Sequence, residues 1–302
     1  MLCLKCRLEI ENTEISHYGL HLNCFKEWFS TSHATEFISL KKRSSATSEA
    51  ETRNGPQDTS FFHGKFKKYS ADLDGNSYIL KMKQEEVEEL PEVEYLCNQI
   101  GKQLGIPVAE FYFINFHDEN TFVTKNFIAP SGAPTDLQHI YHFRPDDQHS
   151  CEGIINAIIK QTEKPYDVKI IIKTILFDAL IGNHDRHGRN LAFIAKAKDF
   201  ALSPIYDNVS YLALEKDEML KADHNPTGRI CTSDTFEPSM KDYVKEFKKL
   251  GYQDVLKEFY QSIKIELLIQ LITESYCSDQ MKEAIKKLVK KRFTELENEY
   301  LN

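Results

Sequence analysis

The sequence predicts an α+β fold in which a small β-rich part precedes a larger helical part and follows a short metal-binding segment. Asp74-Gly75 separates two strand-like runs, 67–73 and 77–82, which is a strong signal for a β-hairpin. From about residue 150 onward, apolar residues recur at helical spacing. Near the N-terminus, paired cysteines and a histidine have the spacing of zinc ligands.

The metal-binding segment comes first. Cys3 and Cys6 form a C-x-x-C pair, and His21 and Cys24 form an H-x-x-C pair. Two ligands separated by two residues can reach one ion from a single turn, and Zn²⁺ prefers thiolate and imidazole. The pattern resembles the first finger of LIM-type modules. It predicts a structural Zn²⁺ held by these four residues, with His17 as the alternative histidine; the other reading is a reduced C-x-x-C pair with His21 on a helix face.

The β-rich part follows a polar stretch. Residues 40–60 lack apolar periodicity, and we predict a linker or mobile loop there. After the hairpin, residues 91–104 have helical spacing, and Gly105 stands where a helix would stop. Two further strands are predicted, over 109–114 and 121–127.

The C-terminal part is predicted to be helical. Its helices are expected over 153–161, 166–181, 243–250, 255–274 and 280–300. The predicted domains are a zinc-binding module with its linker over 1–45, the β-rich part over 46–130 and the helical part over 131–302.

Charge and hydropathy exclude several classes of protein. A net charge of -8 gives no basic footprint, so we expect no direct contact with nucleic acid. The longest apolar stretch, 170–181, contains Lys173 and Asp178 and is too short to cross a bilayer, so no membrane partner is expected. The N-terminus lacks the basic region and the long apolar run of a signal peptide, which predicts a cytoplasmic protein.

The most informative segment combines a polar loop with a following carboxylate. It reads Gly182-Asn-His-Asp185-Arg-His-Gly-Arg-Asn190, and Pro204-Ile-Tyr-Asp207-Asn follows. Phosphoryl transfer needs a carboxylate that accepts the proton of the attacking hydroxyl, and it needs an amide and a second carboxylate that hold Mg²⁺ against the phosphates. The Asp-x-x-x-x-Asn spacing lets one loop present both side chains.

These strings closely resemble the HipA-like kinases, whose catalytic loop has the form N-x-D-x-H-x-x-N and is followed by a Y-D motif. The resemblance covers about residues 58–302 and is greatest to the short, HipT-type members. It implies a bilobal protein-kinase-like fold, with a β-rich N-lobe and a helical C-lobe, that binds ATP and Mg²⁺. By position, it implies Asp185 as catalytic base and Asn190 and Asp207 as Mg²⁺ ligands. His187 matches the loop histidine of the family, a structural brace near ATP.

The resemblance also implies residues that bind ATP in the β-rich part. Lys81 stands where the family has the lysine that neutralises the α- and β-phosphates, and Lys83, on the same face of the strand, is the alternative. Glu94 aligns with a family glutamate and would pair with Lys81; the alternative is an exposed helix glutamate. The other implied ATP contacts are Gly64 in a phosphate-covering loop and Lys125 and Phe127 in the hinge strand.

The loop around Gly64 departs from the family form S-x-x-G-x-Q-x-K, because Phe66 replaces the usual glutamine. HipA-like kinases phosphorylate a serine of this loop in themselves. The resemblance therefore implies Ser60 or Thr59 as the site of autophosphorylation, and the alternative is the serine and threonine cluster over 44–48.

Residues and resemblance together predict an ATP-dependent Ser/Thr protein kinase of the HipA-like toxin type, which phosphorylates a protein and itself. The resemblance implies a toxin–antitoxin setting, with an antitoxin protein as partner and an aminoacyl-tRNA synthetase or another translation factor as substrate. A lipid or small-molecule kinase is the alternative, because phosphoinositide-type kinases also carry a D-R-H-x-x-N loop. A non-catalytic, zinc-containing pseudokinase or binding module is the third hypothesis, against which the intact set of Asp185, Asn190 and Asp207 argues.

Overall fold

The chain divides into a sheet-based unit and a mostly helical unit. The computed structural model describes residues 1–11, 15–43, 68–83, 87–128, 135–143, 149–196 and 199–301. The first unit comprises Met1–Tyr95 and Ala109–Ala129, and the second comprises Leu96–Val108 and Pro130–Asn302. One sheet-rich and one helical unit confirm the predicted α+β class.

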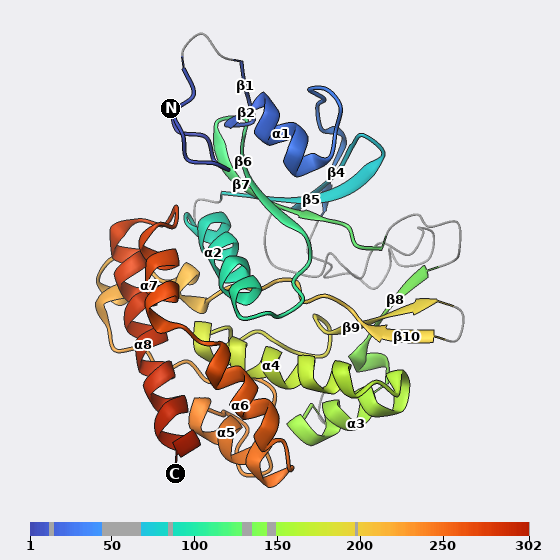
Figure 1. Cartoon of the computed structure of the whole chain (residues 1–302), viewed down its shortest axis with the longest axis vertical. Helices are drawn as coiled ribbons and strands as arrows, with labels where there is room; N and C mark the ends of the chain where they lie inside the picture. The colour runs from blue at the N-terminus through green and yellow to red at the C-terminus, as the bar shows by residue number, and fades with distance from the viewer. Residues whose placement is uncertain are drawn as a thin grey trace. The chain divides into compact units, whose positions relative to one another are not determined.

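The first unit is built on a five-stranded antiparallel sheet (Figure 1). Its strands, in spatial order, are β3 (Ile38–Arg43), β4 (Lys68–Leu73), β5 (Asn76–Met82), β7 (Glu119–Lys125) and β6 (Phe111–Phe116). Strands β4 and β5 form the predicted hairpin, with φ of 48° at Asp74 and 76° at Gly75. Positive φ at both central residues is the turn geometry that Asp-Gly favours, so the sequence signal and the turn agree.

Strand β3 corrects the prediction of a linker that begins at residue 40. Lys41 pairs with Ser70 and Lys42 with Tyr69 in the ladder between β3 and β4. The strand lies at the edge of the sheet, and even Leu40 is exposed. An edge strand tolerates charged residues and needs no buried face, so its sequence lacks the alternation that identifies inner strands. The remainder of the predicted linker, 44–60, lies outside the described residues.

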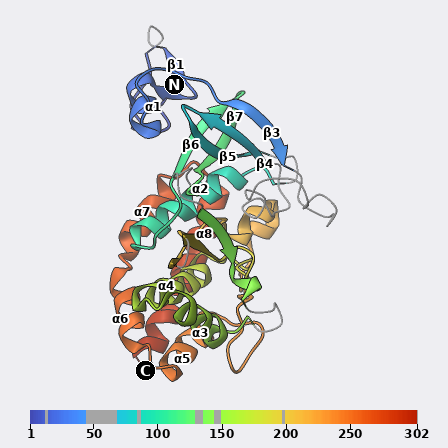
Figure 2. The same cartoon turned by 90° about the vertical axis from the view of Figure 1, so that its right-hand side faces the viewer.

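Helices cover both faces of this sheet. The N-terminal segment contains the short strands β1 (Ser16–His17) and β2 (Leu20–His21) and the helix α1 (Leu22–Phe29), which lies on one side of the sheet in Figure 2. On that side, α1 and the sheet share a core of aromatic side chains that includes Phe25, Phe29, Tyr78 and Tyr112. The first turns of α2 (Leu90–Gln103) pack on the opposite face, where the ring of Tyr95 lies 5.1 Å from that of Phe113.

The second unit packs its helices around the buried helix α4. The helices are α3 (Cys151–Thr162), α4 (Pro165–Ile181), α5 (Met240–Lys249), α6 (Gln253–Ser262), α7 (Ile265–Thr273) and α8 (Asp279–Leu301). Helix α8 packs against α4, α5 and α7 (Figure 1). The prediction of one helix over 255–274 is wrong, because the backbone becomes extended at Ile263 and Lys264, where ψ is 110° and 92°. No glycine or proline marks this break in the sequence.

A three-stranded antiparallel sheet supports the polar loop that follows α4. Its strands, in spatial order, are β10 (Asp199–Leu202), β9 (Ala192–Lys196) and β8 (Thr135–His139). Strand β9 begins directly after the loop, and β10 leads into the segment that carries Asp207. The hairpin of β9 and β10 therefore brings the loop after α4 and the segment that carries Asp207 to one end of α4. Within the described part of the chain, no helix has both the length and the apolar character needed to span a membrane.

Candidate active site

The candidate catalytic loop begins at the C-terminus of α4. Gly182 ends the helix with a φ of 72°, and its N–H donates to the carbonyl of Asp178. A Cβ at Gly182 would lie 2.8 Å from Leu288, so both the backbone conformation and the close packing require glycine here. The chain therefore leaves α4 in a defined direction and enters the polar loop.

Arg186 is the buried centre of this loop. Its guanidinium donates two hydrogen bonds to the carboxylate of Asp178, at 2.8 and 3.0 Å. It also donates to the carbonyl of Tyr206 at 2.8 Å and to Oδ1 of Asn208 at 2.5 Å. Since Tyr206 and Asn208 flank Asp207 in the sequence, one side chain ties the loop to the segment that carries Asp207. We call this set of contacts the Arg186 clamp.

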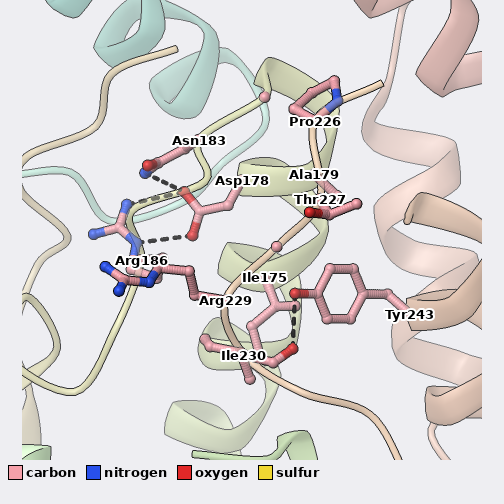
Figure 3. A pocket seen from close by; sticks show the side chains of 12 residues that line it. Ile175, Asp178, Ala179, Asn183, Arg186, Pro226, Thr227, Arg229, Ile230 and Tyr243 are labelled. Atoms are coloured by element: carbon pink, nitrogen blue, oxygen red, sulfur yellow. Dashed lines mark hydrogen bonds and ion pairs between the residues drawn. The ribbon is translucent and has the colours of Figure 1, made fainter. Parts of the chain in front are cut away.

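Both oxygens of the Asp178 carboxylate accept hydrogen bonds, and burial raises the pKa of this carboxyl while Arg186 acts to lower it. Burial alone would lower the pKa of Arg186, but the adjacent carboxylate of Asp178 outweighs burial and raises it. Asn183 donates to Oδ1 of Asp178 at 2.9 Å (Figure 3). The side-chain oxygen of Asn183 also accepts the N–H of Asp185 at 3.1 Å. The buried ion pair thus extends through Asn183 to the backbone of the proposed base.

Asn190 braces the same loop from its other end. Its side-chain amide donates to the carbonyl of Asp185 at 2.9 Å, and its Oδ1 accepts the N–H of His187 at 2.7 Å. An amide oxygen has a second lone pair, so Oδ1 retains the capacity to bind a cation. The Nδ1 atom of His187 accepts the N–H of Arg189 at 3.1 Å, which places His187 among the braces of the loop.

Asp207 has an unusual backbone conformation. Its φ is 53°, in the left-handed region that residues other than glycine rarely occupy. On one side of Asp207, Asn208 is buried and donates to Oδ1 of Asn98 at 3.0 Å. On the other side, the carbonyl of Tyr206 accepts a hydrogen bond from Arg186. Carboxylate and amide oxygens are the ligands that Mg²⁺ prefers, so Asp207 and Asn190 fit this ion.

Sequence reasoning missed the partner of Asp185. Arg229 donates from Nη1 to Oδ1 of Asp185 at 2.9 Å, and both side chains are exposed, by 59% and 63%. The backbone around Arg229 is fixed, because Tyr243 donates to the carbonyl of Ile230 at 2.8 Å and a Cβ at Gly228 would lie 1.9 Å from the Tyr243 hydroxyl. No sequence spacing signals a contact between residues so far apart.

A small pocket lies beneath the loop, between α4 and the segment that carries Arg229 (Figure 3). Its lining includes Asp178 and Arg186 from the clamp, and Arg229 and Tyr243 from the other side. Sequence reasoning noted Asp178 as an interruption of an apolar helix without assigning it a role. A lone carboxylate in a buried helix needs a partner, and this was the available signal for the clamp.

In the first unit, the two lysines considered for ATP binding occupy different environments. Lys81 on β5 forms an ion pair with Glu94 on α2, and the two residues are only 5% and 1% exposed. The side chain of Lys83 is 48% exposed and lies 3.7 Å from Glu88. Lys81 thus belongs to a buried charge pair on the α2 face of the sheet, while Lys83 belongs to the surface.

The other predicted ATP contacts are less distinctive. Lys125 ends β7, its ammonium lies 3.7 Å from Glu110, and its N–H donates to the Glu110 carbonyl. The N–H of Asn126 donates to the carbonyl of Ser77, and Phe127 follows as a half-buried residue. The amide donors of residues 125 and 126 are therefore used within the first unit. The predicted phosphate-loop and modification residues, Gly64, Ser60 and Thr59, lie outside the described residues.

The four predicted zinc ligands lie together in the first unit. The ligand atoms of Cys3, Cys6, His21 and Cys24 all lie within 4.8 Å of one another. His17, the alternative, instead directs Nε2 at the carbonyl of Thr35, at 2.8 Å. Burial acts to raise the pKa of Cys3, but backbone hydrogen bonds from Cys6 and His21 help to outweigh it and lower the pKa to about 6. At Cys3 this favours the thiolate, which is the form of cysteine that binds metals, whereas burial raises the pKa of Cys24 to about 12.

One family model, two curated proteins and two solved structures resemble this chain. A model of the HipA-like C-terminal domain matches residues 60–264. A protein of Haemophilus influenzae named "Putative kinase" is 32% identical over 161 residues, 47% of this chain and 47% of that protein. The "Putative kinase Y4dM" of Sinorhizobium fredii is 25% identical over 154 residues, 45% of this chain and 38% of that protein. The matches thus span less than half the length of either curated relative.

Two solved structures share the fold. The Helicobacter pylori proinflammatory kinase CtkA has a TM-score of 0.66 at 18% identity, over 78% of this chain and 90% of that one. The HipA chain of the Shewanella oneidensis toxin–antitoxin complex of HipA, HipB and operator DNA has a TM-score of 0.53 at 16% identity, over 73% and 58%. At such identities the likeness shows the fold alone. Because the domain model matches more than half of the sequence, the chain belongs to the HipA-like C-terminal domain family.

Proposed function

We propose that the protein is an ATP- and Mg²⁺-dependent kinase that phosphorylates serine or threonine in a protein substrate. The observation that carries this proposal is the Arg186 clamp, which joins the loop of Asp185 and Asn190 to the segment of Asp207. A base and two oxygen ligands on one buried scaffold are the groups that phosphoryl transfer requires. Membership of the HipA-like family supports the same activity.

Each residue of the loop has a proposed role. Asp185 accepts the proton of the substrate hydroxyl while the hydroxyl oxygen bonds to the γ-phosphorus and the bond to the ADP oxygen breaks. Asn190 and Asp207 hold Mg²⁺ through their side-chain oxygens. Bound Mg-ATP supplies the phosphoryl group and the cation that neutralises its charge. His187 keeps the loop in shape through its backbone contact with Asn190.

Arg229 is proposed as a positioning residue. Its guanidinium holds one oxygen of Asp185, which orients the other carboxylate oxygen. A salt bridge between two exposed side chains contributes little stability, so its value would lie in this orientation.

The nucleotide is proposed to be bound in part by the first unit. Lys81, held by Glu94, neutralises negative charge on the α- and β-phosphates. Removing two charges from water is costly, and a buried ion pair is weak evidence for stability alone, so the presence of this pair favours a role in binding. Gly64, Lys125 and Phe127 remain proposed contacts to ATP.

The proposed setting is a toxin–antitoxin system. In the Shewanella complex, HipA is found together with HipB, and by analogy we propose a protein antitoxin as partner. An aminoacyl-tRNA synthetase or another translation factor is the proposed substrate, and Ser60 or Thr59 the proposed site of autophosphorylation.

The experiment that tests the activity offers two acceptors side by side. The protein is incubated with Mg²⁺ and γ-labelled ATP, once with a cell extract and once with phosphoinositide vesicles, because the D-R-H-x-x-N string of residues 185–190 also occurs in lipid kinases. We expect label on protein serine or threonine, identified by phosphosite mapping. Label on lipid alone would support the lipid-kinase alternative, and no transfer to any acceptor would support the pseudokinase.

A further inference from the structure

We propose that Cys3, Cys6, His21 and Cys24 bind one Zn²⁺ that holds α1 against the sheet and thereby supports the strand that carries Lys81. The site would be a structural part of the nucleotide-binding unit rather than a separate module ahead of it. Three features support this: the geometry of the ligands, their connection to the sheet, and the two faces of β5.

The spacing of the ligand atoms suits a tetrahedral ion. With Zn–S near 2.3 Å and Zn–N near 2.0–2.1 Å, a tetrahedral site places sulfur and nitrogen roughly 3.6 Å apart. The Nδ1 atom of His21 lies 3.4 Å from Sγ of Cys6 and 4.0 Å from Sγ of Cys24, on either side of that value. Cys3 supplies the third sulfur within the same cluster. A small adjustment of side chains would complete the coordination.

The outer contact of His21 fixes its tautomer for metal binding. Its Nε2 lies 3.1 Å from the carbonyl oxygen of Glu9. A carbonyl can only accept a hydrogen bond, so Nε2 carries a hydrogen, and in the neutral imidazole that binds a metal Nδ1 then has the lone pair that faces the sulfurs. Histidine ligands in zinc sites regularly donate their second ring N–H to a carbonyl or carboxylate, as His21 does here. This contact distinguishes a built site from a chance cluster of thiols.

The segment that carries the ligands is joined to the sheet. The backbone N–H of Asn115, on β6, donates to the carbonyl of Tyr18 at 2.9 Å, and the N–H of Leu4 donates to the carbonyl of Gly19 at 3.0 Å. A Cβ at Gly19 would lie 2.8 Å from Leu4 and 3.2 Å from Asn115, so the turn between the ligand pairs lies directly against the sheet. Cys3 itself is buried in the same core as the sheet residues.

Helix α1 begins at the ligand pair and carries the aromatic residues that cover the sheet. Cys24 lies in its first turn, and Phe25 and Phe29 follow on its buried face. The ring of Phe29 lies 5.6 Å from that of Tyr78 on β5 and 4.5 Å from that of Tyr112 on β6. A metal that fixes Cys24 therefore fixes the start of the helix that covers the sheet. An isolated helix of eight residues is not stable in water, so α1 depends on its packing against the sheet, to which the metal would add a fixed end.

The two faces of β5 connect this core to the proposed ATP lysine. Side chains alternate along a strand, so Tyr78 and Leu80 face the α1 core while Lys81 faces α2 and pairs with Glu94. Loss of the metal would loosen α1, expose the aromatic face of the sheet and weaken the strand that positions Lys81. Only the effect on the ATP-binding role of Lys81 rests on the proposed function; the metal site and its effect on the sheet do not.

The first test measures metal content. Protein purified under reducing conditions should contain about one Zn²⁺ per chain by elemental analysis. Cys24→Ser should contain none, while Cys231→Ser should retain it. Cys231 is the matched control because its thiol is also partly buried but lies in the second unit. Wild-type protein without zinc, or Cys24→Ser with a full complement, would overturn the site.

The second test measures amide hydrogen exchange in the wild-type protein before and after a chelator removes the metal, so it does not require a foldable variant. Exchange in β5 and β6 should accelerate on the order of tenfold or more, exchange in α4 and α8 should not change, and added Zn²⁺ should restore protection. Unchanged exchange in β5 and β6 after complete removal of zinc would refute the coupling. Neither readout depends on phosphoryl transfer, so failure here is separate from failure of the kinase assignment.

Discussion

Replacement of Arg186 by methionine should destabilise the helical unit and misplace the catalytic loop. The substitution removes the four hydrogen bonds described above and a fifth, at 3.4 Å, to the carbonyl of Asn190, and it leaves the buried carboxylate of Asp178 without its cation. Breaking a buried ion pair from one side costs about 3–5 kcal/mol, because the remaining charge is uncompensated. With about 2–4 °C per kcal/mol for a unit of this size, the melting temperature should fall on the order of 10 °C.

The assay is urea and thermal unfolding followed by far-ultraviolet circular dichroism, which reports mainly on the helices of the second unit. Arg189→Met is the matched control. It removes an exposed arginine from the same loop, 5.4 Å from the ring of Tyr141, and should cost less than about 1 kcal/mol.

A double variant separates stability from geometry. Asp178→Leu combined with Arg186→Met removes both charges, and replacement of a buried ion pair by apolar residues is often neutral for stability. We expect the double variant to recover much of the lost stability but not phosphoryl transfer, because its methionine cannot bond the Tyr206 carbonyl or Asn208. A cost below about 1 kcal/mol for Arg186→Met alone, or wild-type activity in the double variant, would refute the clamp.

Variants of Lys81, Asp207 and Arg229 test the roles proposed for these three residues. Lys81→Met should weaken ATP binding on the order of tenfold or more in equilibrium titrations, while Lys83→Met should not, because Lys83 lies at the surface; equal effects would contradict the assignment. Asp207→Ala should abolish the gain in nucleotide affinity that Mg²⁺ provides, measured by titration with and without the ion. If Mg²⁺ still raises the nucleotide affinity of this variant, Asp207 is not a ligand of the ion. Arg229→Ala should lower kcat about tenfold with little change in the KM for ATP, and Arg229→Lys should recover part of the loss. A change in KM alone would instead indicate a role for Arg229 in binding ATP.

Local features of the fold were predictable from the sequence because their signals are local. The hairpin follows from Asp74-Gly75, where neighbouring residues determine the turn. Strand β3 was missed because an edge strand has no required apolar pattern, and the break between α6 and α7 at Ile263 carries no glycine or proline. Both errors concern elements that packing defines more strongly than local propensity does.

The candidate site was predictable in its motif but not in its supporting contacts. The spacing of Asp185, Asn190 and Asp207 identified the segment that the structure shows to be braced by Arg186. The burial of Arg186 was not predictable, because the sequence around a buried loop arginine has no feature that distinguishes it from the sequence around an exposed one. The contact of Arg229 with Asp185 depends on how the chain returns to the loop, which no local pattern encodes.

The zinc-ligand spacing was similarly visible in the sequence, whereas the attachment of that segment to the sheet was not. The contact between the Tyr18 carbonyl and the Asn115 amide joins two segments that are distant in the sequence. The segment that carries the zinc ligands shares its core with β4, β5, β6 and β7. Such sharing arises from tertiary packing of aromatic residues, which periodicity alone does not reveal.

A comparison of the wild-type protein with Asp185→Asn tests the proposed role of Asp185 as the base of a protein kinase. Wild-type protein and Asp185→Asn are given saturating Mg-ATP with labelled γ-phosphate and a protein extract, and ATP affinity is measured in parallel. The amide keeps the shape of the carboxylate but cannot accept the hydroxyl proton, so we predict unchanged ATP affinity and a loss of transfer of about 10²–10⁴-fold. Transfer to protein at the wild-type rate by Asp185→Asn would show that Asp185 is not the base.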